Sequence, residues 1–257
     1  MLRAMPSSIP AWLSILFTLI SGLVFGSFSS ALIYRVPSRE SLLTRSKCTK
    51  CSKQLGATEN IPLISYLVLR GKCSGCGSRI SWIYPTLEVG LAALFLFPVL
   101  YFSSWTAIFF WVAISIFGVP LLVIDLKHHR LPDLLTISLF LLVLVILLVS
   151  AIATSTYNRL IPSCLGALGV MAFYLGLLII SRGGMGMGDV KLSASIGLVS
   201  GYFGLKAVFL SSFSAFSLGA IFGIFAMIFG KAGRKTAIPF GPFIIVGQLI
   251  SMLVYSR

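Results

Sequence analysis

The chain has 257 residues, of which 58% are hydrophobic and only 10% are charged, and its mean hydropathy is +1.03. This composition excludes an ordinary soluble domain and indicates a polytopic membrane protein. The net charge of +14 comes from basic residues that lie in short connections between apolar runs. We therefore expect the lipid bilayer as a partner and no nucleic acid, which would need a basic patch on a soluble fold.

Eight apolar runs predict an all-α protein with about eight transmembrane helices. The runs cover residues 11–34, 84–102, 105–124, 134–152, 161–180, 190–203, 207–229 and 238–255. The first run lacks a small-residue cleavage site, so we expect a retained helix and not a signal peptide. The sixth run is short for a hydrocarbon core of ~30 Å, so we expect it to be tilted or sunk within the fold.

Three segments of different character follow from these runs. Residues 11–34 form the first transmembrane helix, residues 35–83 a polar loop, and residues 84–257 a seven-helix membrane domain. Sixteen of the 20 basic residues fall on the side of the membrane that carries the loop. The positive-inside rule therefore places the loop in the cytoplasm and both termini on the opposite side.

Four of the five cysteines lie in the polar loop, as Cys48-x-x-Cys51 and Cys73-x-x-Cys76. Two such pairs supply four thiolates for a tetrahedral Zn²⁺, which would be structural because no coordination position stays open. Disulfides and free thiols are the alternatives, and a cytoplasmic loop argues against disulfides. Because the loop is too short for a core of its own, metal binding would contribute much of its folding free energy.

Three aspartates stand where polar connections meet apolar runs. Asp133 precedes a run, so we expect it to cap the next helix. Asp125 ends a run, where the helix macrodipole disfavours an anion. It is either a functional acid or a surface acid paired with Lys127 or Arg130. Asp189 opens the sixth run, either as a helix cap or as a second functional acid, because a carboxylate at the membrane is costly unless it is paired or working.

The stretch 184–188 before Asp189 reads Gly-Met-Gly-Met-Gly. Glycines allow tight turns in conformations that residues with a Cβ resist. We expect them also to keep the approach to Asp189 clear for an extended substrate backbone. The stretch does not complete a G-x-G-x-x-G motif between a strand and a helix, so a nucleotide site is not expected.

The predicted topology places Asp125 and Asp189 at the same membrane face. Two carboxylates brought close in a partly desolvated site share a proton, so that one is a base and the other an acid. Such a pair can hydrolyse a peptide bond, since the ionised carboxylate activates water and the protonated one polarises the carbonyl. The alternative is a proton-coupled transporter, although the two halves of the chain show no matched repeats.

Two further acids have two interpretations each. Glu59 lies in the loop and Glu88 at the membrane interface. They either pair with Arg70 or Arg79, or they meet a basic substrate segment or an amine.

The order of motifs resembles one family, the bacterial type IV prepilin peptidases, which are aspartic membrane proteases of the Gly-x-Gly-Asp kind. The matching segments, in chain order, are Gly26-Ser27-Phe28, Tyr34-Arg35-Val36-Pro37, Cys48-x-x-Cys51, Glu59-Asn60-Ile61-Pro62, Arg70-Gly71-Lys72-Cys73-x-x-Cys76, Tyr84-Pro85-x-x-Glu88, Ile124-Asp125, Leu131-Pro132-Asp133, Gly186-Met187-Gly188-Asp189 and Ile238-Pro239-Phe240-Gly241-Pro242-Phe243. Single motifs are weak evidence, but this many in one order are specific.

This resemblance implies a multi-pass enzyme of the bacterial inner membrane that cuts the basic leader from type IV prepilins or type II secretion pseudopilins. It matches Asp125 and Asp189 to the catalytic aspartates of the family. The partner that it implies is the N-terminal leader of a prepilin or pseudopilin together with the apolar helix of that pilin. Members with the cysteine loop also methylate the new N-terminus with S-adenosylmethionine. Ser30 stands where the family usually has Asn. No residues are predicted to bind S-adenosylmethionine.

Overall fold

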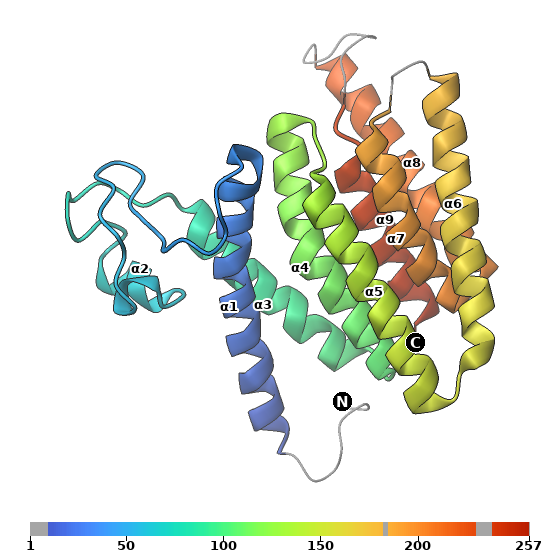
Figure 1. Ribbon diagram of the computed structural model, residues 1–257, viewed down its shortest axis with the longest axis horizontal. Helices are drawn as coiled ribbons and strands as arrows, with labels where there is room; N and C mark the ends of the chain where they lie inside the picture. Colours follow the sequence, from blue (N-terminus) through green and yellow to red (C-terminus); the bar gives the residue numbers. More distant parts are fainter. Residues whose placement is uncertain (1–9, 182–184, 230–237, 257) are drawn as a thin grey trace. The chain divides into compact units, whose positions relative to one another are not determined.

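The computed structural model describes residues 10–181, 185–229 and 238–256 and is entirely helical over these ranges, apart from loops (Figure 1). Every predicted apolar run corresponds to one long helix. The long helices are α1 (Ala11–Ser38), α3 (Ile83–Tyr101), α4 (Trp105–His128), α5 (Asp133–Thr154), α6 (Leu160–Ile180), α7 (Met187–Phe203), α8 (Leu205–Ile228) and α9 (Gly241–Tyr255).

Six of the helices within the described ranges are long and apolar enough to cross a membrane, namely α1, α3, α4, α5, α6 with the turn before it, and α8. The helices α7 and α9 are shorter, with 17 and 15 residues. At 1.5 Å per residue, α7 extends over roughly 25 Å. The structure thus confirms a multi-helical membrane architecture, while the predicted number of eight spans remains a prediction.

Two helices extend four residues past their predicted ends. The helix α1 ends at Ser38 and α4 at His128, and each is followed by a residue with left-handed backbone geometry, Arg39 (φ 56°) and His129 (φ 50°). A left-handed residue terminates the helical hydrogen-bond ladder. The extension of α4 places Asp125 inside its last turn.

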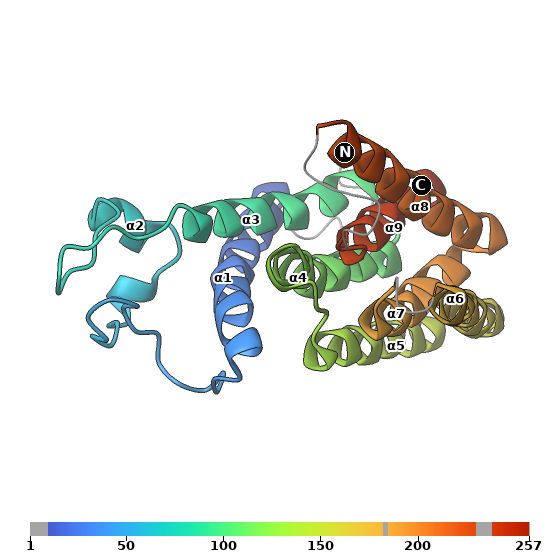
Figure 2. The ribbon, with the colours of Figure 1, turned by 90° about the horizontal axis from the view of Figure 1, so that it is seen from above.

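The chain forms two compact units, Met1–Leu100 and Tyr101–Arg257, which are described separately. In the second unit, α7 contacts α5, α6, α8 and α9 (Figure 2). Most of its residues are buried. The short sixth run therefore lies within the fold, which was one of the predicted explanations for its length.

Glycines allow the helices around α7 to approach closely. A Cβ at Gly197 would lie 2.4 Å from the carbonyl oxygen of Gly166 in α6, and a Cβ at Gly201 would lie 2.5 Å from the carbonyl oxygen of Pro162. Small residues are common at such contacts, because membrane helices associate mainly through close packing.

In the first unit, α1 and α3 cross in the same manner. A Cβ at Gly22 would lie 2.5 Å from the Cα of Ala92, and a Cβ at Gly26 would lie 2.4 Å from the Cα of Glu88. The loop between these helices contains a 3₁₀ turn (Thr58–Asn60) and the short helix α2 (Ile64–Val68). Glu88 therefore lies at the point where the membrane helices meet.

Candidate active site and metal centre

The four loop cysteines converge on one point of the first unit. The Sγ atoms of Cys48, Cys51, Cys73 and Cys76 all lie within 4.8 Å of one another. The Sγ–Sγ distance is 3.9 Å both between Cys48 and Cys76 and between Cys51 and Cys73. Zn–S bonds of ~2.3 Å in a tetrahedron require about 3.8 Å between sulfurs. The cluster thus fits a metal of this kind, as predicted.

Hydrogen-bond donors favour the thiolate form of two of these cysteines, Cys48 and Cys76, whereas the neighbouring thiols raise the pKa of Cys51 to about 11. The N–H groups of Cys51 and Lys50 approach the sulfur of Cys48 and lower the pKa of that thiol to about 6. Ser78, through its side chain and then its backbone, likewise lowers the pKa of Cys76. Amide donors that point at sulfur are what a thiolate ligand needs before a metal can bind.

Arg35 fixes the start of the loop. Its side chain is buried at the end of α1, and its Nη1 donates hydrogen bonds to the carbonyl oxygens of Ser41, Leu42 and Thr44 at 3.4, 3.0 and 2.7 Å. An arginine that satisfies several main-chain carbonyls can hold an irregular segment in one conformation. No role was predicted for Arg35 beyond its place in a motif.

Neither Glu59 nor Glu88 pairs with Arg70 or Arg79, so that interpretation of these two acids is wrong. Glu59 accepts hydrogen bonds from the hydroxyl of Ser74, from the N–H of Gly56 at 2.8 Å and from Nζ of Lys53 at 3.1 Å. These three donors, in that order, lower the pKa of Glu59 to about 2. The Oε2 atom of Glu88 accepts a hydrogen bond from the N–H of Leu63 at 2.8 Å.

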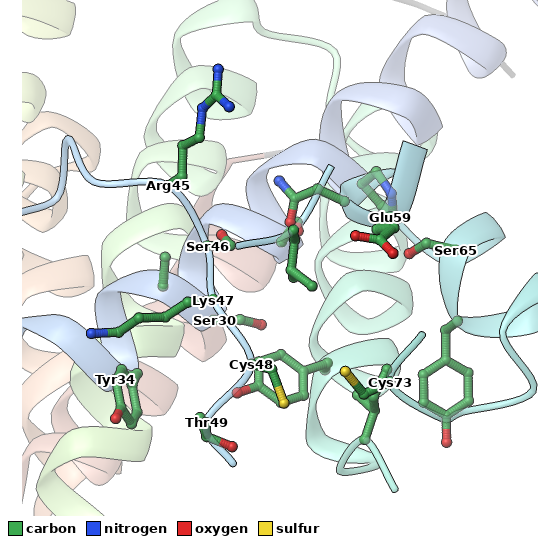
Figure 3. Close-up of a pocket in the computed structure, with 18 of the residues that line it drawn as sticks. Ser30, Tyr34, Arg45, Ser46, Lys47, Cys48, Thr49, Glu59, Ser65 and Cys73 are labelled. Atoms are coloured by element: carbon green, nitrogen blue, oxygen red, sulfur yellow. The ribbon is translucent and has the colours of Figure 1, made fainter. Parts of the chain in front are cut away.

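A cavity of about 1350 Å³ lies beside the cysteine cluster within the first unit. It is lined by residues of α1, the loop and the start of α3, among them the aromatic rings of Tyr34, Tyr66 and Tyr84 and the carboxylates of Glu59 and Glu88. Figure 3 shows side chains of the loop and of α1, including those of Cys48 and Cys73, around this cavity. Aromatic faces together with carboxylates are suited to a cationic ligand.

In the second unit, Asp125 is 5% exposed and lies in the last turn of α4. Its Oδ2 atom accepts a hydrogen bond from the N–H of Gly241 at 3.0 Å. Gly241 is the first residue of α9, so the carboxylate lies at the positive end of a second helix. This contact offsets the unfavourable end of α4. No ion pair joins Asp125 to Lys127 or Arg130 in the described part of the chain, so that alternative is wrong.

Asp189 is 7% exposed and lies in the first turn of α7. Its Oδ2 atom accepts a hydrogen bond from the N–H of Gly186 at 3.1 Å, so the acid does cap its own helix. Its Oδ1 atom is buried and has no hydrogen-bond partner among the described residues. One oxygen of this carboxylate therefore has a structural contact, and the other is unused.

The structure brings the two acids to neighbouring helix N-termini. Asp125 and Asp189 are close enough for their charges to interact. Leu131 lies against both helix starts: a Cβ at Gly188 would lie 2.7 Å from the Cβ of Leu131, and a Cβ at Gly241 would lie 3.0 Å from its Cδ2. The connection between α4 and α5 thus packs against the N-termini of α7 and α9.

Gly188, directly before Asp189, has a different role from the one predicted. Gly186 has φ −83°, which any residue adopts, and Gly188 lies within α7. The space beside Gly188 is filled by Leu131 and is not open to a substrate. Close packing therefore explains Gly188, and Gly184 lies outside the described residues.

Asp133 differs from its prediction. It is the first residue of α5 but makes no side-chain cap, and its Oδ1 atom pairs with Nζ of Lys191 at 2.7 Å. This ion pair joins α5 to α7, the helix that carries Asp189. The predicted cap is absent because Pro132 occupies the N-cap position, so Asp133 is the first helical residue and its carboxylate pairs with Lys191 instead.

Sequence reasoning missed two buried polar residues in this unit. Tyr174 of α6 is within electrostatic range of Asp189. Gln248 of α9 is fully buried, and neither polar atom of its amide has a partner among the described residues. Gln248 is the only amide side chain inside the predicted apolar runs, and this signal was available in the sequence.

Comparisons with known proteins agree with the two-unit description. Residues 20–102 match a model described as the bacterial peptidase A24 N-terminal domain, and residues 108–224 match the type IV leader peptidase family. A Bacillus subtilis protein named prepilin leader peptidase/N-methyltransferase is 34% identical, over 94% of each chain. The chain belongs to the type IV leader peptidase family.

Two further relatives of the same name support this membership. The proteins of Stutzerimonas stutzeri and Pseudomonas aeruginosa are 33% and 32% identical, each over 93% of this chain and 90% of the relative. No solved structure matches the chain. The comparisons give no support to a proton-coupled transporter.

In this leader peptidase family member, Ser30 stands where the family usually has Asn. Ser30 lines the cavity and donates its hydroxyl to the carbonyl of Gly26 at 3.3 Å.

Proposed function

We propose that this protein is a prepilin leader peptidase in which Asp125 and Asp189 are the catalytic residues. The observation that carries the proposal is a pair of buried, interacting carboxylates at neighbouring helix N-termini. Each carboxylate accepts one backbone N–H at about the same length, 3.0 Å for Asp125 and 3.1 Å for Asp189. Backbone donors fix the orientation of both side chains, which general acid–base catalysis requires.

The proposed reaction follows from a proton shared by the pair. The ionised carboxylate takes a proton from water, and the water oxygen adds to the carbonyl carbon of the scissile peptide. The protonated carboxylate donates to the carbonyl oxygen at the same time. The C–N bond then breaks, and a proton passes to the leaving amine, which becomes the new N-terminus of the pilin. The unpaired Oδ1 of Asp189 is one acceptor available to the water.

We further propose that the first unit methylates this N-terminus. S-Adenosylmethionine supplies an electrophilic methyl group on a sulfonium cation. The cavity beside the cysteines has a volume of about 1350 Å³. Pockets for small ligands usually enclose ~300–1000 Å³, so this cavity has room for more than a single small ligand. Tyr34 and Tyr84 would stack on the purine or face the sulfonium, and Glu88 would attract a cationic group. Zinc held by the four cysteines would keep the loop folded beside this cavity.

The membrane orientation is part of the proposal. The excess of basic residues on the loop side supports a cytoplasmic location for the loop and for both aspartates, with the termini in the periplasm. The basic leader of a prepilin or pseudopilin would then reach the aspartates from the cytoplasm, while its apolar helix stays in the bilayer.

Single substitutions of the aspartates test the peptidase proposal. Asp125→Asn and Asp189→Asn proteins, reconstituted in lipid vesicles with a prepilin, are expected to lose cleavage by at least ~100-fold, the usual contribution of acid–base catalysis. Asp133→Asn is the matched control. It removes an exposed ion pair, whose free energy is ~0–1 kcal/mol, and is expected to cleave within a few-fold of the wild type. Near-normal cleavage by either dyad variant would overturn the proposal.

A further inference from the structure

The helix α2 of the cysteine loop has two different faces. Ser65, Tyr66 and Leu69 line the cavity on one side. On the other side, the apolar side chains of Ile64, Leu67 and Val68 are 58%, 71% and 75% exposed. None of these three lines the cavity. Adjacent apolar side chains with this exposure mark a surface that meets a membrane or another protein.

A further exposed apolar residue, Trp82, lies beside α2. It is 74% exposed, and its ring lies 5.5 Å from that of Tyr66 in α2. It also directly precedes α3, one of the helices long enough to cross the membrane. Tryptophan at the end of a membrane helix usually lies at the level of the lipid headgroups. We define the α2 patch as Ile64, Leu67, Val68 and Trp82.

Unpaired basic residues follow α2 in the chain, and one of them, Arg79, also lines the cavity. Arg70 follows α2, and Lys72 and Arg79 face each other across an antiparallel bridge. All three are exposed and make no ion pair within the described ranges. The acids of this unit are engaged elsewhere: Glu40 with Lys47, Glu59 with Lys53, and Glu88 with the N–H of Leu63.

We propose that the α2 patch is a membrane-interface anchor, which inserts into the headgroup region of the leaflet on the loop side while Arg70 and Lys72 bind anionic phospholipid. The loop is tethered at both ends, by α1 and by α3, so it cannot move far from the bilayer. Trp82 lies between α2 and the start of the membrane helix α3, and the basic residues Arg70 and Lys72 complement anionic headgroups. A positively charged or uncharged partner would gain nothing from these basic residues.

Anchoring goes beyond the proposed enzymatic function and does not depend on it. Because α2 also lines the cavity, the anchor would hold that cavity at the membrane surface. There, the N-terminus of a membrane-embedded substrate would emerge after cleavage.

Site-specific fluorescence of the full chain tests the anchor. A Leu67→Trp protein is reconstituted in nanodiscs that contain phosphatidylglycerol brominated close to the headgroup. The fluorescence of the introduced tryptophan is the difference between the emission of the variant and that of the wild type. This emission is expected to be blue-shifted, and bromine should quench at least half of it. Lys50→Trp, which places the same probe on the exposed cysteine loop, is the matched control and should lose little emission.

Hydrogen exchange of the unmodified protein provides a second readout that needs no variant. Backbone amides of residues 64–70 should exchange several-fold more slowly in phosphatidylglycerol nanodiscs than in phosphatidylcholine nanodiscs, and Arg70→Gln with Lys72→Gln should remove most of that difference. Unquenched, water-like emission at position 67 with exchange independent of lipid would overturn the anchor. Blue-shifted but unquenched emission, or protection that rises with protein concentration, would also overturn it, since another protein surface or a second copy would then cover the patch.

Discussion

In each of the two units a carboxylate accepts a hydrogen bond from a backbone N–H group, but the part of the chain that supplies this N–H differs between the units. Glu88 in the first unit accepts the N–H of Leu63, and Asp125 in the second accepts the N–H of Gly241. In both cases a carboxylate from a membrane helix binds a backbone amide that is distant in sequence. Leu63, however, belongs to an irregular loop, whereas Gly241 opens a helix.

The consequence is that the two units depend on different stabilising contacts. The loop of the first unit is held by Arg35, by local hydrogen bonds and by the cysteine cluster. The second unit is held by helices that meet at glycines. Loss of a ligand should therefore disorder the loop of the first unit, while added volume should disturb the glycine-mediated helix contacts of the second unit and of the α1–α3 crossing.

The largest effect is expected from the metal site. Cys73→Ser removes one of four ligands and should abolish methyl transfer, because the loop then loses the metal that contributes much of its folding free energy. Zinc content should fall from one atom per chain to nearly none by elemental analysis. Cleavage should remain within a few-fold of the wild type, since the aspartates lie in the other unit. Wild-type protein without zinc would contradict this account.

Added volume beside Asp125 should have the next largest effect. In Gly241→Ala, the new Cβ would lie 2.9 Å from the Oδ2 of Asp125, so that carboxylate must move. We expect cleavage to fall by about 10-fold or more, equivalent to about 1.4 kcal/mol in the barrier. The control is Gly169→Ala in α6, where a Cβ meets nothing within 4 Å. If both variants cleave equally well, the packing around Asp125 is not important.

Added volume at a glycine of the first unit should affect methyl transfer instead of cleavage. Gly26→Ala would place a Cβ 2.4 Å from the Cα of Glu88 and force α1 and α3 apart, a change that costs about 1–3 kcal/mol. Methyl transfer should fall several-fold, and the thermal midpoint should drop. Gly90→Ala, which adds a Cβ in open space on α3, should change neither measurement. Equal thermal midpoints for both variants would argue against a tight crossing.

A smaller, pH-dependent effect is expected at Glu59. The pKa of this carboxyl is lowered from 4.5 to about 2, so its ionised form stabilises the loop. That contribution is fully present above pH 4.5 and disappears as the pH falls toward 2. Glu59→Gln should accelerate exchange of the Gly56 amide near neutral pH by a few-fold, while Glu40→Gln should not. The difference from the wild type should shrink below pH 4.5, and a difference that grows there would contradict the assignment.

Much of this architecture follows from the sequence because lipid imposes strong constraints. Apolar runs predicted every long helix, and the two Cys-x-x-Cys pairs predicted a cluster that the structure brings together. The spacing of two ligand pairs fixes local chemistry without any knowledge of the fold. The two aspartates proposed as catalytic were likewise marked by their cost at the membrane.

Contacts between distant segments were the part that sequence could not supply. The N–H of Gly241 lies 116 positions from Asp125, and no pattern pairs them. Asp133 looked like a helix cap until Lys191 was seen beside it. Glu59 was expected to pair with an arginine, whereas a serine, a backbone amide and a lysine surround it. Side-chain partners depend on packing, which local preferences do not determine.

The central claim is that the two units carry separate chemistry, and one experiment addresses it directly. Asp189→Asn protein is given a pilin peptide that already has its mature N-terminus, and transfer of labelled methyl from S-adenosylmethionine is measured beside Cys73→Ser protein. We predict near-normal methylation by Asp189→Asn, which cannot cleave, and none by Cys73→Ser, which can. Loss of methylation in Asp189→Asn despite an intact fold would contradict the separation.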